Sequence, residues 1–164
     1  PALLVAARAI RRHWPAARCV FAARTEEDAA AIRAACPEQL PSHLEIATAR
    51  TVEVLSGAHF ALAKSGTNTL QAAWFGVPMV TFYRTSLFER VGYRLLSSWL
   101  IRTPHFALVN LLAGRRIVPE IMPWSGSARQ LTDMVIDTMT DFGYLFQVRR
   151  ELLDVIDQIG RAHV

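Results

Sequence analysis

The sequence lacks the features that mark several large classes of protein. Its 164 residues include only two cysteines, Cys19 and Cys36, which are too few for a disulfide framework or a four-ligand zinc site. This low cysteine content is typical of a reducing compartment. No apolar run reaches the ~18 residues that a membrane-spanning helix needs. The histidines do not have the HExxH spacing of a metal site, and there is no GxSxG elbow, Walker loop or GxGxxG fingerprint.

The residues that are present indicate a folded domain with an uneven charge distribution. Hydrophobic residues make up 52% of the chain and charged residues 20%, which is enough for a sizeable core and close to one domain by length. The net charge is +4, and residues 82–116 contain six arginines against one glutamate. This excess predicts contact with phosphate groups or an anionic membrane surface, or else a solvated basic helix face. Nucleic acid is not an expected partner, because no recognition module accompanies the charge.

Apolar runs and helical spacing alternate along the chain. The expected strands cover 19–23, 44–47, 60–63, 79–83 and 106–109. The expected helices cover 3–13, 26–36 with Thr25 as the cap, 52–56, 68–75, 87–101, 128–140 and 144–157, with a turn or short helix over 110–115. This order predicts an α/β fold, a Rossmann-like parallel sheet with helices on both faces. Ligands of such sheets bind at the carboxyl ends of the strands.

The turn Ser65–Thr69 follows one of these strands and is the first candidate site. Gly66 allows a tight turn and close approach of a ligand. Free amides at the start of the next helix favour an anion such as a diphosphate, and Ser65, Thr67 and Thr69 add hydroxyl donors. An ordinary strand-to-helix turn with a capping hydroxyl explains the same residues, so both interpretations stay open.

Two further segments are candidates on weaker grounds. Asn110 can hydrogen-bond in both directions and Arg115 offers a charged fork for phosphate, although a capped turn with a solvated arginine is the alternative. Arg90 and Arg94 lie on the helix expected over 87–101, and Arg102 directly follows it. That helix is either an amphipathic core helix or a contact with an anionic membrane surface.

Three segments together resemble the lipid A disaccharide synthase family. Residues 64–73 (KSGTNTLQAA) resemble its SGTxxLEAA motif, and residues 76–80 with Tyr83 and Arg84 are similar to GVPMVxxYR. Residues 108–120 (LVNLLAGRRIVPE) resemble LPNLLAGRxxVPE. The resemblance covers residues 1–157. It implies one half of a GT-B architecture, the C-terminal domain that binds the UDP-sugar.

The resemblance also implies an activity and a site. Enzymes of this family are inverting glycosyltransferases that join UDP-diacylglucosamine to diacylglucosamine 1-phosphate without a metal or other cofactor. The expected catalytic carboxylate and the acceptor site belong to an N-terminal domain, so the chain alone is predicted to be inactive. The expected substrate-binding residues are Ser65, Gly66, Thr67, Asn68, Thr69, Gln71, Arg84, Asn110 and Arg115.

The resemblance further predicts location, partners and boundaries. We expect a cytoplasmic protein that contacts the anionic inner membrane peripherally. The resemblance also implies that the protein can form a homodimer. The chain is expected to be truncated at its N-terminal side, so that it lacks the PGSR loop that precedes the first helix of this half in the family, and the strand that leads into that loop. Residues 158–164 resemble a translated sequencing adapter, and residues 1–157 form the expected domain.

Departures from the family pattern leave other functions open. Gln71 replaces the glutamate of SGTxxLE, which keeps an acceptor but removes a charge, and Val109 replaces the proline before Asn110. One alternative is another GT-B enzyme, such as a UDP-N-acetylglucosamine epimerase or a different sugar transferase. Another is a non-catalytic paralogue that binds a nucleotide or a membrane surface. The stretch 123–126 has no assigned role.

Overall fold

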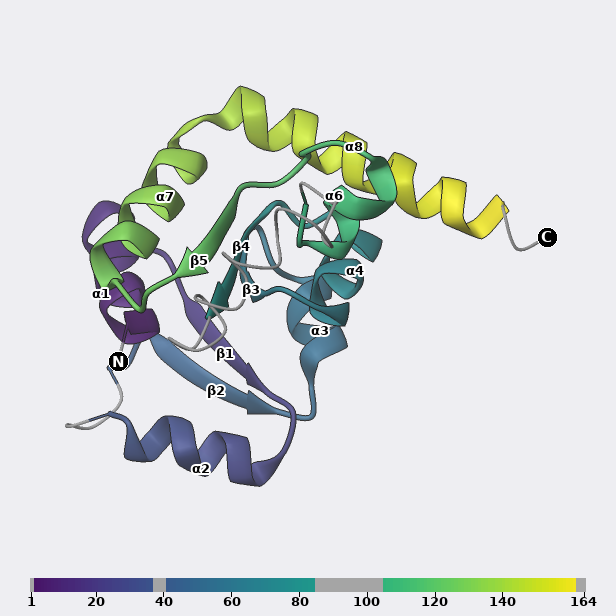
Figure 1. Ribbon diagram of the computed structural model, residues 1–164. Coiled ribbons are helices and arrows are strands. Elements are labelled where there is room, and N and C mark those ends of the chain that lie inside the picture. Colours follow the sequence, from purple (N-terminus) through teal and green to yellow (C-terminus); the bar gives the residue numbers. More distant parts are fainter. Residues whose placement is uncertain (1, 37–40, 85–104, 162–164) are drawn as a thin grey trace, which may run out of the picture. The chain divides into compact units, whose positions relative to one another are not determined.

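The structure is a computed structural model that describes residues 2–36, 41–84 and 105–161 (Figure 1). Its strands are β1 (Cys19–Ala23), β2 (Leu44–Thr48), β3 (Ala61–Lys64), β4 (Met79–Arg84) and β5 (Glu120–Trp124). Its helices are α1 (Ala2–His13), α2 (Glu26–Ala34), α3 (Thr51–Ser56), α4 (Thr67–Trp74), α6 (Leu108–Ala113), α7 (Ala128–Thr140) and α8 (Phe142–Arg161). The helix expected over 87–101 lies outside the described residues.

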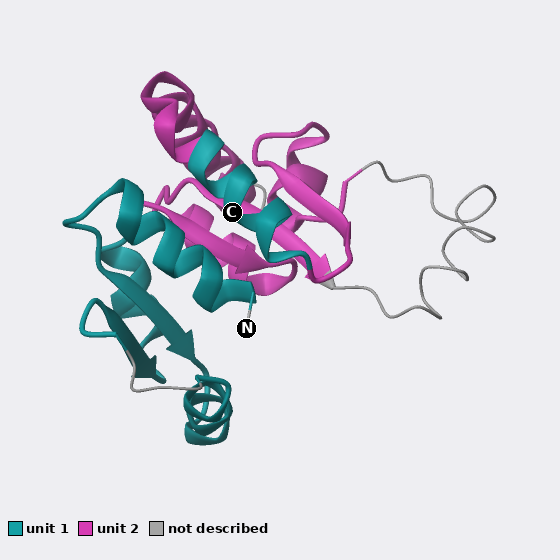
Figure 2. Cartoon of the chain, turned by 90° about the vertical axis from the view of Figure 1, so that its left-hand side faces the viewer, with its two compact units in different colours: residues 1–58, 127–137 teal, residues 59–126, 138–164 magenta. Residues whose placement is uncertain are grey.

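The chain divides into two compact units, which Figure 2 shows in different colours. Unit 1 comprises residues 1–58 and 127–137, and unit 2 comprises residues 59–126 and 138–164. Unit 1 holds a two-stranded sheet of β1 and β2, and unit 2 a three-stranded sheet in the order β3-β4-β5. All of these pairs are parallel and helices flank the strands, which confirms the predicted α/β class, with the parallel strands divided between two sheets.

In unit 1, the two strands run in register and helices contact them. Cys19 pairs with Leu44 at one end and Ala23 with Thr48 at the other. Helices α2 and α3 both contact this sheet. Thr25 caps α2 as predicted, because its Oγ1 accepts a hydrogen bond from the Asp28 amide at 3.1 Å.

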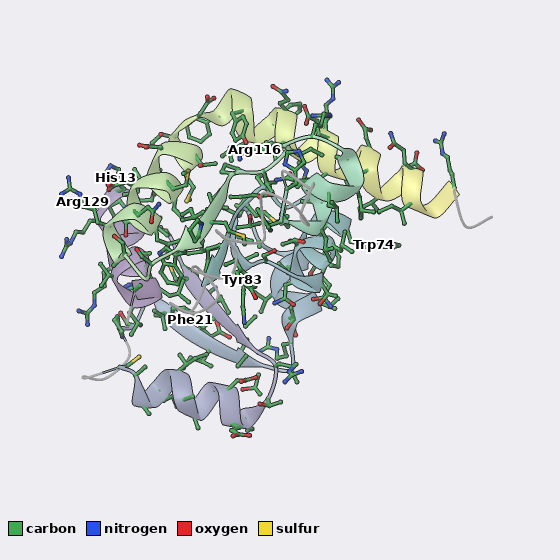
Figure 3. All side chains as sticks on the ribbon, in the orientation of Figure 1. His13, Phe21, Trp74, Tyr83, Arg116 and Arg129 are labelled. Carbon is green, nitrogen blue, oxygen red and sulfur yellow. The ribbon has the colours of Figure 1, made fainter. Side chains whose placement is uncertain are left out.

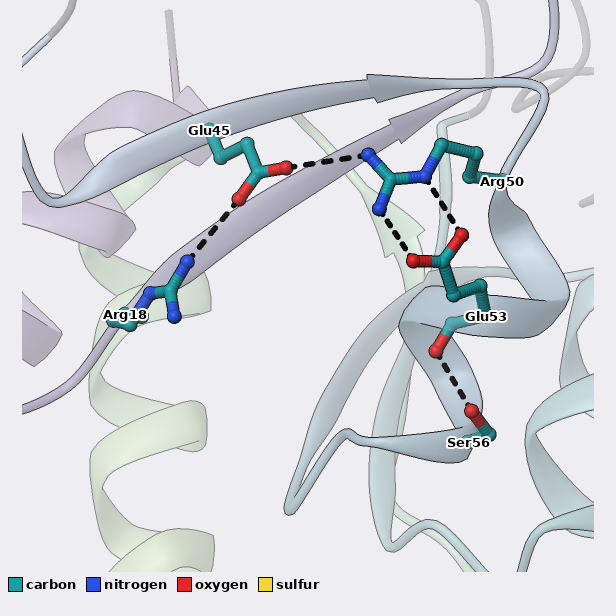
Figure 4. Close-up of polar contacts among 5 residues, drawn as sticks. All are labelled: Arg18, Glu45, Arg50, Glu53 and Ser56. Atoms are coloured by element: carbon teal, nitrogen blue, oxygen red, sulfur yellow. Dashed lines mark hydrogen bonds and ion pairs between the residues drawn. The ribbon is translucent and has the colours of Figure 1, made fainter.

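A chain of exposed ion pairs in unit 1 runs from the residue before β1 through β2 to α3 (Figure 4). Arg18 contacts Glu45 on β2 at 3.4 Å, and Glu45 contacts Arg50 at 3.7 Å. Arg50 also holds Glu53 of α3 through two hydrogen bonds, which raises the pKa of the arginine and lowers that of the glutamate. Because these side chains are exposed, solvent screens the pairs and they stabilise the unit only weakly.

The sheet of unit 2 has an apolar core. Met79 and Val80 of β4 are almost fully buried, as is Ile121 of β5. The rings of Phe82 and Trp124 meet edge to face with their centroids 5.0 Å apart. Aromatic pairs in this arrangement add to the stability that burial alone provides. The core therefore holds the carboxyl ends of β3 and β4 in a fixed place.

Helix α4 packs closely against α8 in the same unit. Gly76 follows α4 with φ of +60°, as expected for a residue that ends a helix, and a Cβ at this position would lie 3.0 Å from Leu153 Cγ. Trp74 projects from the end of α4 and is 67% exposed (Figure 3). The glycine is thus required both for its backbone conformation and for the approach of the two helices.

One predicted strand is wrong and one observed strand was not predicted. Residues 106–109 do not form a strand, because α6 begins at Leu108 and the amides of Phe106 and Ala107 donate to the Glu120 carboxylate. Strand β5 lies at the edge of its sheet, where Pro123 is tolerated. The other helices and strands that fall within the described ranges are found within a few residues of their expected bounds. No helix there has the length and apolar character that a membrane span requires.

Candidate functional site

The first candidate site lies where β3 ends and α4 begins. β3 ends at Lys64, Ser65 and Gly66 make the turn, and α4 starts at Thr67. Gly66 has φ of +142°, a conformation that other residues rarely adopt. A Cβ built on it would have no described atom within 4 Å, so the turn is open on that side. A glycine suits this position because the chain turns from β3 into α4 within two residues.

Two of the three hydroxyls expected as ligand donors instead brace this turn. Ser65 Oγ donates to the carbonyl of Phe106 at 2.7 Å, and Thr69 Oγ1 donates to the carbonyl of Gly66 at 2.7 Å. The Thr69 side chain is fully buried. Each hydroxyl has one proton to donate, so these two protons are already engaged within the protein.

The groups left open at the turn are on the first turns of α4. Thr67, Asn68 and Gln71 are all exposed, and Thr67 and Gln71 are one helical turn apart on the same side. Within the described residues, no side chain caps α4, and the first amides of any helix lack partners inside it. In the described part of the chain, the amides of Thr67 and Asn68 therefore remain as N–H donors at the start of α4, beside a threonine hydroxyl and two side-chain amides.

Asn110 is placed differently from the other candidates. It is fully buried in α6, and its Oδ1 accepts from the amides of Ile117 at 2.7 Å and Val118 at 2.9 Å. Its Nδ2 donates to the Val118 carbonyl at 2.8 Å and to Glu120 Oε1 at 2.5 Å. Both protons of the amide are thus used within the protein, and the side chain holds the loop between α6 and β5. A direct contact with ligand stays a prediction.

Glu120, at the start of β5, was not among the expected site residues. Its carboxylate accepts from the amides of Phe106 at 3.1 Å and Ala107 at 3.0 Å, and from Asn110. Because Phe106 also accepts the Ser65 hydroxyl, these bonds connect the turn after β3 to Asn110. The only sequence signal for this residue was its place at the end of the third motif.

In the described part of the chain, Arg115 has its contact with α8 and none with this network. Arg115 pairs with Glu151 of α8 at 2.5 Å, and Gln147 donates to the same carboxylate. The hydrogen bond from Gln147 and the contact with Arg115 lower the pKa of Glu151. Arg84 ends β4, where its backbone pairs with Trp124, and its side chain lies outside the description. The roles of both arginines in binding stay predictions.

Unit 1 has a separate hollow at the carboxyl ends of β1 and β2. Its lining includes Arg24, Ala49 and Arg50. Glu45 and Glu53 already balance the positive charge of Arg50, so this arginine attracts an anionic ligand less strongly. In the parts of the chain that the structure describes, no group of three histidine, cysteine, aspartate or glutamate residues could hold a metal ion.

Comparison with known proteins identifies the family. The model of the lipid-A-disaccharide synthetase family matches residues 1–138. The lipid-A-disaccharide synthase of Anaeromyxobacter sp. (strain K) is 33% identical over 141 residues, which cover 86% of this chain and 36% of that protein. The enzymes of that name from Geobacter sulfurreducens (strain ATCC 51573 / DSM 12127 / PCA) and Gluconobacter oxydans (strain 621H) are 30% identical over 166 residues and 35% identical over 108 residues. These alignments cover 98% and 66% of this chain, and 40% and 25% of the respective relatives.

The matched segments contain the residues of the candidate site. The turn after β3, helix α6 and Glu120 all fall within residues 1–138. The chain spans two-fifths or less of the length of these three relatives. By its match to the family model over most of its length, the chain belongs to the lipid-A-disaccharide synthase family.

Proposed function

We propose that this chain is the donor-nucleotide-binding part of a glycosyltransferase of lipid A biosynthesis. The proposed whole enzyme transfers diacylglucosamine from UDP to diacylglucosamine 1-phosphate and releases UDP. The configuration at the anomeric carbon of the transferred sugar is inverted. Membership of the family supports the reaction class. The observation that carries the binding role is the open, uncapped start of α4 directly after Gly66.

The proposed site holds the diphosphate at the start of α4. Unpaired amides and the positive end of the helix dipole favour an anion at this place. Negative charge builds on the UDP oxygen as the glycosidic bond breaks, and fixed donors that face this charge stabilise the transition state by roughly 3–4 kcal/mol each. We propose that no metal ion is needed, because these donors and the arginines expected from the family motifs meet the charge.

The exposed side chains have distinct proposed roles. Thr67 and Asn68 donate to phosphate oxygens, and Gln71, one turn further along α4, contacts the ribose. Ser65 and Thr69 act indirectly, because their hydroxyls hold the turn in shape. Thr67→Ala is therefore a cleaner probe of binding than a change at Asn110, which is buried and fully hydrogen-bonded.

Titration calorimetry with UDP tests the proposal. We expect saturable UDP binding that ADP does not match. Thr67→Ala should weaken it about tenfold, the effect of losing one hydrogen bond to a charged group. Gln71→Ala should also weaken binding, whereas replacing Gln130, which is likewise exposed but lies on α7, with alanine should not. A folded chain that does not bind UDP would contradict the proposal.

Two assays separate the alternatives. Free UDP-N-acetylglucosamine that competes for the site as strongly as the acylated donor would favour an epimerase or a different sugar transferase. A large gain of activity from Gln71→Glu in a longer protein containing this chain would favour a non-catalytic paralogue that has lost the family glutamate. We expect neither result.

The basic segment supports a peripheral membrane location at the cytoplasmic face. Arg90, Arg94 and Arg102 would interact with anionic headgroups of the inner membrane. Each arginine near the surface would contribute about 1 kcal/mol to the free energy of membrane binding. Replacing all three with glutamine should reduce cosedimentation with vesicles that contain phosphatidylglycerol. Unchanged binding to these vesicles would rule out this role.

A further inference from the structure

We infer that Glu120 is a positioning residue of the donor site, which acts on the turn after β3 through the peptide between Phe106 and Ala107. The inference rests on the proposed function, because it assigns Glu120 a role in that same site. It does not require Glu120 to touch the nucleotide.

The geometry joins Glu120 to the turn in two steps. The Ala107 amide donates to Glu120 Oε1 at 3.0 Å, and the Phe106 amide donates to Oε2 at 3.1 Å. The carbonyl of Phe106 accepts the Ser65 hydroxyl at 2.7 Å. Ser65 directly precedes Gly66, the residue that opens the turn.

The planar peptide group between Phe106 and Ala107 transmits the effect of Glu120 to the turn after β3. The carbonyl of Phe106 and the amide of Ala107 belong to the same planar peptide group and point in opposite directions. Glu120 therefore fixes this peptide from its N–H side while Ser65 is bonded to its carbonyl side. If the N–H side is released, the plane can rotate and the acceptor of the Ser65 hydroxyl moves.

A carboxylate suits this role better than other side chains. It is an acceptor at both oxygens, so it can bind two successive amides and the Asn110 side chain at once. Within the described residues, no side chain of α6 itself caps the start of that helix. Glu120, which comes from β5, takes the amides that precede α6 and links them to the sheet.

Three variants at the two ends of this connection test the inference. Glu120→Ala removes all three hydrogen bonds, and Glu120→Gln keeps one acceptor oxygen, so it should have the smaller effect. Ser65→Ala breaks the connection at the other end and leaves Glu120 with its partners. Asp154→Asn is the control, because it removes an exposed carboxylate from α8 in the same unit.

UDP titration of these variants should show that the two ends act together. We expect Glu120→Ala and Ser65→Ala each to weaken UDP binding about tenfold, as supporting residues around a site commonly do. The double variant should bind as the single variants do, because both break the same connection. Asp154→Asn should bind as the unmodified chain does. Effects that add in the double variant, or unchanged affinity in Glu120→Ala, would overturn the inference.

Amide hydrogen exchange gives a readout that does not need UDP. The Thr69 amide is bonded to the Gly66 carbonyl at 3.1 Å, so its protection reports on the turn. We expect this amide to exchange at least about tenfold faster in Glu120→Gln and Ser65→Ala than in Asp154→Asn. If the unmodified chain does not bind UDP, the proposed function fails, and exchange alone then decides the inference. Faster exchange at Phe106 and Ala107 with no change at Thr69 would refute it.

Discussion

Replacing Asn110 with alanine should destabilise the chain more than any exposed substitution in the site. The side chain makes four hydrogen bonds and is fully buried. Alanine leaves the amides of Ile117 and Val118 without the Oδ1 acceptor, in a place where these residues are at most 2% exposed. A buried polar group that loses its partner costs about 1–3 kcal/mol, so two such amides cost roughly 4 kcal/mol.

This loss is large compared with the stability of a typical domain, about 5–15 kcal/mol. With a urea dependence of about 2 kcal/mol per molar, the unfolding midpoint should fall by roughly 2 M. Urea titration followed by circular dichroism measures this change. Asn68→Ala is the matched control, since Asn68 is exposed on α4, and its midpoint should stay nearly unchanged.

A second substitution at position 110 tests the same hydrogen-bond network by introducing a negative charge. Asn110→Asp keeps the acceptor for the two amides but sets a second carboxylate beside Glu120, which is 2.5 Å from Nδ2 in the native protein. Stability relative to the native protein should be low at neutral pH and recover as pH falls and the pair takes up a proton. A loss below about 1 kcal/mol in Asn110→Ala would refute the reasoning, because it would mean that the amides find other partners.

Three other predictions concern the packing and charge around α8. Gly76→Ala should cost about 1–3 kcal/mol, because of its positive φ and the 3.0 Å approach to a leucine of α8, whereas Gly57→Ala should be nearly neutral in the same urea assay. Tyr144→Phe should cost about 1 kcal/mol in that assay through the lost 3.0 Å bond to a backbone carbonyl. The folded-state pKa of Glu151 lies below its ordinary value of 4.5, so its contribution to stability is present above that value and lost as pH falls through the folded pKa. The unfolding midpoint of Glu151→Gln should therefore fall less than that of the native chain as pH drops below 4.5, and an equal fall would contradict this.

Local patterns were sufficient to predict most of the elements. The apolar run 19–23 forms β1 with those same bounds, and the acids after Thr25 mark the start of α2. These signals are local, because they depend on burial of neighbouring side chains and on helix caps. The family motifs located the turn after β3 and helix α6 for the same reason: they are short and contiguous.

The connections between the motifs could not be predicted in this way. The bond between Ser65 and Phe106 joins residues 41 positions apart, and Asn110 uses its amide on a loop that folds back over it. Strand β5 contains Pro123, which argues against a strand unless the edge position in the sheet is known. Each of these features depends on tertiary structure, so the sequence predicted neither the hydrogen bonds of Asn110 within the protein nor a role for Glu120.

The proposed binding of UDP at the start of α4 is tested most directly by mapping the bound nucleotide through the chemical shifts of backbone amides. Adding UDP to the isotope-labelled chain should shift the amides of residues 66–69, with smaller changes at Phe106 and Ala107. The same titration with Thr67→Ala should need more UDP for equal shifts. Saturation with UDP that leaves residues 66–69 unchanged, with shifts confined to the hollow around Arg24 and Arg50 or to other elements, would contradict the account.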